Sequence, residues 1–249
     1  VYLPYCDGSL FAGDVDHDDN HDGTPERQQH GLRNLSAALD VALATFPNPP
    51  EIVLAGSSGG GYGTIIATPL VRLSYPTTRM SVINDAGVGL GKDGDPTFVQ
   101  GLIDEFNARN LVPVSCTECS TASHLMPLIR YQLQQDPSLR IGAFSTTRDG
   151  IISGMYLRMP AATFENMLRR ETGNLHAEFP NHYQYFITTG TFHTTLLGDI
   201  SGFLGEDAGG LGDAIHLGSI DTTTAQGILI SDWLGWLVDG DPAWGSYAD

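Results

Sequence analysis

The sequence has few basic residues. Only 12 of its 249 residues are lysine or arginine, against 29 acidic residues, and Lys92 is the one lysine. The formal net charge is −17. Surfaces that bind nucleic acid carry a stripe of lysine and arginine, and attachment to acidic membranes needs a polybasic cluster. We therefore expect no nucleic acid among the partners and no polybasic attachment to a membrane.

Long hydrophobic runs are also absent. No stretch approaches the roughly 18 apolar residues of a membrane-spanning helix, so no membrane span is expected. Hydrophobic residues still make up 41% of the chain, which is enough for a sizeable core. The chain starts at Val1 without a signal-like stretch, and residues 1–5 (VYLPY) resemble the end of a strand. We expect one domain over residues 1–249 that begins inside a longer protein and lacks its N-terminal strands.

Cysteine is scarce and its count is odd. Cys116 and Cys119 form a C-x-x-C pair between helical patterns, whereas a redox motif lies between a strand and a helix. Zinc needs four ligands, and His124 is the one nearby addition. A local disulfide or a pair of buried thiols is favoured over zinc. For Cys6 we expect pairing with a residue upstream of Val1. We expect no metal and no cofactor.

Short apolar runs rich in β-branched residues alternate with amphipathic stretches. Runs of this kind are typical of strands covered on both faces of a parallel sheet, and the alternation predicts an α/β fold with helices on both faces. The expected strands are 1–4, 52–56, 80–84, 140–145 and 183–188. The expected helices are 32–46, 60–73, 97–109, 123–135, 154–170 and 225–238.

Two segments depart from this alternation. Residues 87–136 form a long insertion between strands, which we expect to be a helical cap over a site. Residues 14–23 form an acidic loop that matches the first half of a calcium-binding loop at Asp18, Asn20, Asp22 and Gly23. The twelfth position is Gln29, where a calcium loop has a bidentate glutamate, so a solvated loop is favoured over a calcium-dependent module.

The motif G-x-S-x-G occurs once between a predicted strand and a predicted helix, as Gly56-Ser57-Ser58-Gly59-Gly60. This setting is typical of a nucleophile elbow, where small neighbours let a strained turn present the serine. Ser58 is the expected nucleophile and the Gly59 N–H the expected oxyanion donor. The alternative, a phosphate-binding turn, would need the lysine of a Walker loop or the spacing G-x-G-x-x-G.

A nucleophilic serine needs a base and an acid, which follow it in the order Ser, Asp, His in this kind of fold. His193 follows the strand 183–188 by one short turn and is the favoured base, with His216 in reserve. Asp149 and Asp85 each follow a strand, and Asp149 is favoured because its strand precedes the one that leads to His193. We expect Ser57 and Asp85 to line the substrate site.

Several motifs in order resemble the pectin acetylesterase/Notum family of serine carboxylesterases with an α/β-hydrolase-type fold. They are PYCDGSLFAGD, HGLRNLSAALDVAL, VLAGSSGGGYGT, VINDAGVG, FSTTRDG, GTFHTTL and DWLGWLVDGDPAW. The resemblance implies a three-layer sandwich and a triad of Ser58, Asp149 and His193. Family members also carry a glycine- and tryptophan-containing oxyanion loop upstream of the PYC segment. That loop is absent here, so either the chain is an incomplete piece or its oxyanion hole is half-formed.

The function that follows is hydrolysis of an ester through an acyl-enzyme on Ser58. The expected substrate is an acetylated polysaccharide such as pectin, and the expected location is secreted or extracellular, with the periplasm as a variant. The alternatives are a protein or lipid O-deacylase of the Notum type and a non-catalytic carbohydrate-binding member of the fold.

Overall fold

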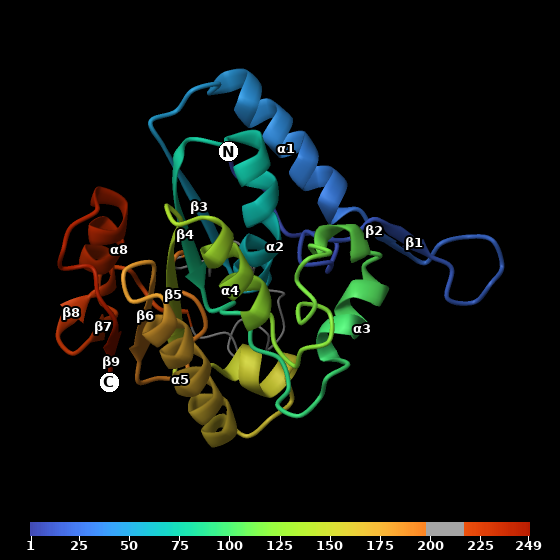
Figure 1. The fold of residues 1–249 in the computed structure, drawn as a ribbon. Helices are drawn as coiled ribbons and strands as arrows, with labels where there is room; N and C mark the ends of the chain where they lie inside the picture. The colour runs from blue at the N-terminus through green and yellow to red at the C-terminus, as the bar shows by residue number, and fades with distance from the viewer. Residues whose placement is uncertain (198–216) are drawn as a thin grey trace, which may run out of the picture.

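A five-stranded parallel sheet forms the centre of the protein in a computed structural model, which describes residues 1–197 and 217–249 (Figure 1). Its strand order is β3-β4-β5-β6-β9, and every neighbouring pair is parallel. The strands are β3 (Glu51–Ser57), β4 (Arg79–Asp85), β5 (Arg140–Thr146), β6 (Tyr183–Thr188) and β9 (Tyr247–Ala248). Four of them are the strands predicted from apolar runs, so the carboxyl ends of four consecutive neighbours lie along one edge.

Helices cover both faces of this sheet. On one face α8 (Ile230–Asp239) packs through Trp233 and Leu237 against Phe144 and Phe186. The opposite face packs against α2 (Gly59–Ser74), α4 (Met126–Gln135) and α5 (Ala161–Glu178), as Figure 1 shows. Successive side chains of a strand point to opposite faces of the sheet. They therefore pack into two different core layers, one under each set of helices. The predicted three-layer α/β architecture is confirmed.

The remaining elements surround the sheet. Helix α1 (Gly31–Thr45) follows a short hairpin of β1 (Val15–His17) and β2 (Arg27–Gln29) that projects from the body in Figure 1. A second hairpin, β7 (Thr224–Ala225) and β8 (Ile228–Leu229), precedes α8. No helix within residues 1–197 and 217–249 combines the length and the hydropathy needed to cross a membrane.

The predicted insertion 87–136 contains several elements. They are α3 (Phe98–Glu105), the 3₁₀ turn η1 (Arg109–Leu111) and α4. Helix α4 belongs to the helical layer, where the Gln132 side chain donates to the Ile65 carbonyl of α2 at 2.6 Å. Cys116 and Cys119 form a disulfide, so these sulfurs are not available as thiolate ligands for zinc. Cys6 is a free, exposed cysteine.

Several predicted elements differ from the structure. The expected helix 225–238 begins only at Ile230, because Gly227, with φ 78°, turns residues 224–229 into the β7–β8 hairpin. The expected helix 97–109 ends as α3 at Glu105, before Asn107 with φ 51°.

Residues 1–4 are not a strand, because a strand needs a hydrogen-bonded neighbour and none of the described residues supplies one; Val1 and Tyr2 are 77% and 81% exposed. The expected helix 154–170 is divided at Pro160 into the π-helical turn η2 (Gly150–Tyr156) and α5. Pro160 precedes α5 with φ −59° and ψ 140°, and it has no N–H with which to extend the hydrogen bonding of η2.

Candidate active site

Ser58 occupies a strained turn between β3 and α2. Its backbone has φ 57° and ψ −120°, a conformation that residues with a side chain rarely adopt. The surrounding backbone leaves no room for side chains: a Cβ on Gly56 would overlap the Gly60 carbonyl, and a Cβ on Gly87 would overlap the Ser58 carbonyl. The Ser58 N–H donates to the Asp85 carbonyl at 2.8 Å, which fixes the turn to β4. This geometry is that of a nucleophile elbow.

Asp149 and His193 form a buried pair at the same edge of the sheet. The His193 Nδ1 and the Asp149 Oδ2 lie 2.7 Å apart, and the two residues are 5% and 0% exposed. The other carboxylate oxygen of Asp149 accepts the N–H groups of Ile151 and Ile152, at 3.0 and 2.9 Å, in the first turn of η2. These two hydrogen bonds hold the carboxylate so that its free oxygen faces the imidazole.

The pairing with Asp149 sets the roles of the two imidazole nitrogens. A neutral His193 donates its Nδ1–H to the carboxylate, which leaves Nε2 as the acceptor that a general base requires. This Nε2 atom is buried and has no hydrogen-bond partner among the described residues. No hydrogen bond joins it to the Ser58 hydroxyl within the described part of the chain. Catalytic hydrogen bonds are commonly long in ligand-free enzymes and shorten when substrate binds.

Asp85 links the turn at Ser58 to the loop that carries His193. Its carboxylate accepts the Ser57 hydroxyl at 2.8 Å, the Thr195 N–H at 2.9 Å and the Leu196 N–H at 2.9 Å. Asp85 is only 1% exposed, and this burial raises the pKa of its carboxyl. The structure thus pairs Asp149, and not the alternative Asp85, with the imidazole. That Ser57 and Asp85 line a substrate site stays a prediction.

Tyr5 contacts the turn but was not foreseen as a site residue. A Cβ built on Gly59 would lie 2.8 Å from the Tyr5 ring, so this ring covers the first residue of α2. The Tyr5 hydroxyl accepts the Leu10 N–H at 3.1 Å. The signal in the sequence was the PYC segment, but nothing there indicates which later residue the ring contacts. His216, the reserve base, lies outside the described residues.

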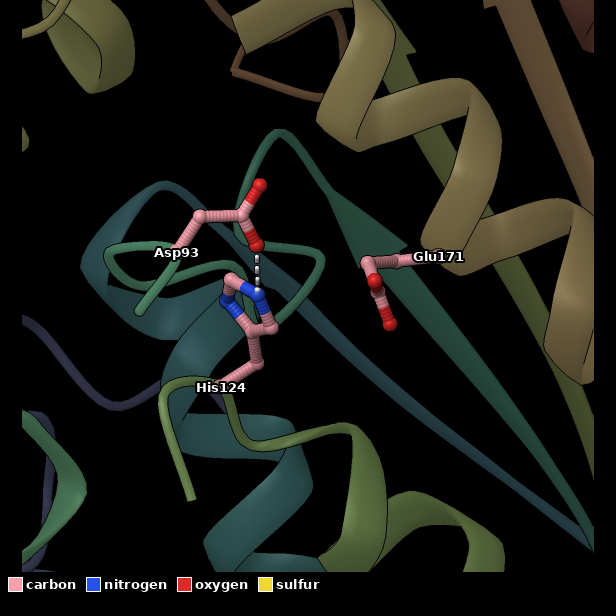
Figure 2. A group of neighbouring side chains, drawn as sticks. All are labelled: Asp93, His124 and Glu171. Atoms are coloured by element: carbon pink, nitrogen blue, oxygen red, sulfur yellow. Dashed lines mark hydrogen bonds and ion pairs between the residues drawn. The ribbon is translucent and has the colours of Figure 1, made fainter. Parts of the chain in front are cut away.

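A second group of titratable side chains consists of Asp93, His124 and Glu171 (Figure 2). Asp93 lies in the loop after β4, His124 in the loop before α4, and Glu171 on α5. The His124 Nδ1 accepts the Gly91 N–H at 2.9 Å, so the proton is on Nε2, which donates to Asp93 at 2.9 Å. Arg170 bonds both Asp93 and Glu171 and lowers the pKa of the Asp93 carboxyl. A metal on Nε2 would move the proton to Nδ1, opposite another N–H donor, so the group fits an ion-pair network better than a metal site.

Asp18 and Asp22 of the 14–23 loop accept backbone N–H groups of their own hairpin. Asp18 accepts the N–H groups of Asp22 and Gly23, and Asp22 accepts that of Thr24. Gln29, at the twelfth position of the calcium pattern, bonds His17 instead and is 5% exposed. Turns in which Asp side chains accept nearby N–H groups are a common use of Asp-rich loops. The arrangement agrees with the solvated-loop interpretation.

Comparisons with known proteins find relatives of part of this chain. A family model described as pectinacetylesterase matches residues 1–121. Pectin acetylesterase 11 of Arabidopsis thaliana is 27% identical over 125 residues, which cover 47% of this chain and 31% of that protein. The chain is similar to the pectin acetylesterases, as its motifs indicated. This resemblance covers the turn at Ser58 and the Asp85 strand.

The fold itself extends the likeness to the rest of the chain. The structure of the Wnt deacylase Notum from Drosophila matches with a TM-score of 0.58 and 16% identity, over 95% of this chain and 66% of Notum. At that identity the match establishes the fold alone. The chain thus spans about a third of the length of its curated relative and about two thirds of the solved structure.

The packing of the turn predicts a strong effect of a single methyl group. Gly56→Ala should destabilise the protein by about 2–4 kcal/mol, because its Cβ would overlap the Gly60 carbonyl and separate β3 from α2. Gly101→Ala in α3 is the matched control: nothing lies within 4 Å of its Cβ, and alanine favours a helix. Urea unfolding of both variants measures the difference. Equal stabilities would contradict the close approach of helix and strand.

The environment of Asp85 predicts a pH-dependent stability. Because burial raises the pKa of the Asp85 carboxyl above its ordinary value, the native state holds this proton more tightly than the unfolded state does. The free energy of unfolding therefore falls as the pH rises from the pKa of Asp85 in the unfolded state through its pKa in the native state. The Asp85→Asn variant lacks this decrease. Urea unfolding from pH 4 to pH 7 should shift the stability difference in favour of the Asn variant. A constant difference would show that burial does not raise this pKa.

Proposed function

We propose that this chain carries the reactive centre of a serine carboxylesterase. Ser58 is the nucleophile, His193 the general base and Asp149 the residue that orients the imidazole. The observation that carries the proposal is the buried Asp149–His193 pair, at 2.7 Å, on the same sheet edge as a serine with φ 57°. The three residues follow β3, β5 and β6, in the chain order that α/β-hydrolases use.

The chemistry follows from the geometry of these groups. The Nε2 of His193 takes the Ser58 hydroxyl proton while Oγ attacks the ester carbonyl and forms a tetrahedral intermediate. The Gly59 N–H, at the start of α2, is one of the donors that a helix N-terminus leaves unpaired within the helix, and we assign it the role of stabilising the oxyanion. The imidazolium then protonates the leaving alcohol, and an acyl-enzyme remains. Water deprotonated by His193 releases the carboxylic acid and restores Ser58.

An acetyl ester of a polysaccharide is the substrate we propose. The support is the similarity to a family and a curated protein that are both named pectin acetylesterase. A net charge of −17 opposes a polyanionic substrate, but exposed charges are screened beyond a Debye length of about 8 Å. An apolar cavity of about 30 Å³ near α3 does not include Ser58 in its lining, so it gives no support to the long acyl group of a Notum-type substrate.

We also propose that the protein works outside the reducing cytosol. The disulfide between Cys116 and Cys119 supports an oxidising compartment, where such bonds persist. The location and the substrate are proposals for the whole protein. The chain matches only part of the length of its relatives.

Covalent labelling tests the nucleophile directly. A fluorophosphonate probe should label the full-length protein at Ser58, because phosphonylation needs the serine, the base and an oxyanion donor. The Ser58→Ala variant should show no label, whereas Ser57→Ala should keep it, since the Ser57 hydroxyl bonds Asp85. Mass spectrometry of the labelled peptide identifies the site. A folded full-length protein without label would favour the non-catalytic, carbohydrate-binding alternative.

The role of Asp149 predicts a large kinetic effect with little change in fold. Asp149→Asn should lower kcat for hydrolysis of p-nitrophenyl acetate by about 10³- to 10⁴-fold, because the amide favours the wrong tautomer of His193. KM should change much less. The measurement is initial rates across substrate concentrations, with circular dichroism as the control for folding. Wild-type kcat in this variant would remove Asp149 from the mechanism.

A further inference from the structure

Three of the residues that line a small buried cavity each carry a polar atom without a partner. These atoms are the Asn84 Oδ1, the Gln132 Oε1 and the Tyr183 hydroxyl, and no described residue bonds any of them. Their residues are 2%, 6% and 0% exposed. The cavity has a volume of about 10 Å³ and lies between β4, β5, β6, α2 and α4. Buried polar atoms are rarely left unpaired, because each such group costs about 1–3 kcal/mol.

The orientation of the two amides is fixed by their nitrogens. The Asn84 Nδ2 donates to the Gly61 carbonyl at 2.8 Å, and the Gln132 Nε2 donates to the Ile65 carbonyl at 2.6 Å. A flipped amide would place an oxygen against a carbonyl oxygen in either case. The residues that line the cavity therefore carry two free acceptors, the amide oxygens, and one hydroxyl that is free to donate.

We propose that this cavity is the binding site of one ordered water molecule. The water donates its two hydrogens to Asn84 Oδ1 and Gln132 Oε1 and accepts the Tyr183 hydroxyl proton. The volume is close to the 10–15 Å³ or so that one water requires, and three polar partners are the usual number for a buried water. Each of the three side chains then has a partner, with the donors and acceptors in balance.

A sodium ion is the alternative ligand that oxygen atoms could hold. It would leave the Tyr183 proton without an acceptor and would bring a charge into a site that has no carboxylate. The remaining lining is neutral: Thr64, Ile65, Thr68, Val82, Val88, Ile129, Ile141 and Ala143. A buried charge without a counter-charge is far more costly than a buried dipole, so water is the occupant the cavity fits.

The water has a consequence for the reactive turn, and this step rests on the proposed function. Gly61 and Ile65 lie in the first two turns of α2, the helix that begins directly after Ser58. Their carbonyls are held by Asn84 of β4 and Gln132 of α4, and the water joins both amides to Tyr183 of β6. Asn84 and the water are thus positioning groups that hold the start of α2 against the sheet.

Tyr183→Phe removes one oxygen and tests the site by the sign of its effect. If the water is present, the variant deprives it of its donor, and Tm should fall by several degrees. If the cavity is dry, the variant removes an unpaired buried hydroxyl, and Tm should rise. Tyr185→Phe, two residues further along the same strand and only partly buried, is the matched control and should leave Tm unchanged.

A high-resolution crystal structure supplies the direct readout. We expect one density peak at hydrogen-bond distance, about 2.7–3.2 Å, from all three polar atoms. An empty cavity, or a peak with the shorter contacts of a metal ion, would overturn the proposal. Tm and density do not depend on activity, so they stay valid even if Ser58 proves not to be a nucleophile. If Ser58 is labelled, the rate of labelling should fall severalfold in Tyr183→Phe, and an unchanged rate would refute the positioning role.

Discussion

The strained backbone of Ser58 is the constraint around which this structure is organised. A residue with a side chain keeps φ 57° and ψ −120° only where the surrounding packing determines its position. Three constraints act on this one turn. The backbone of Gly56 lies against that of Gly60, the backbone of Gly87 lies against that of Ser58, and the Ser58 N–H donates to the Asp85 carbonyl. They connect β3, α2 and the loop after β4, so the turn, the helix direction and the neighbouring strand cannot vary independently.

The parallel sheet then determines which other groups can reach this turn. Neighbouring strands lie about 4.8 Å apart, and the strands β3, β4, β5 and β6 are consecutive neighbours that end at the same edge. Ser57 is paired in register with Asp85, and Thr146 with Thr188, so the residues that follow β5 and β6 leave the sheet together. This is why Asp149 and His193 meet although 44 positions separate them in the sequence.

Much of this arrangement could be predicted from local sequence, and the failures have physical causes. Strands β3 to β6 were recognisable because continuous apolar, β-branched runs need cover on both faces. Residues 1–4 have the same composition, but a strand also needs a neighbour, which composition does not encode. Pro160 divides one helical pattern, and the two-residue strand β9 is too short to show a period. The contact of Tyr5 with Gly59 joins distant segments and left no local signal.

The choice between two aspartates required the structure, because both follow buried strands. In Asp149 two backbone N–H groups occupy one carboxylate oxygen, and the second oxygen is left for His193. In Asp85 both oxygens accept the Thr195 N–H, and one of them also binds Ser57 and Leu196. The carboxylate of Asp85 is thus directed at Ser57 and at the backbone of residues 195 and 196, and not at the imidazole. The difference between the two sites is therefore which groups lie opposite each carboxylate, which depends on the loops and not on the strands.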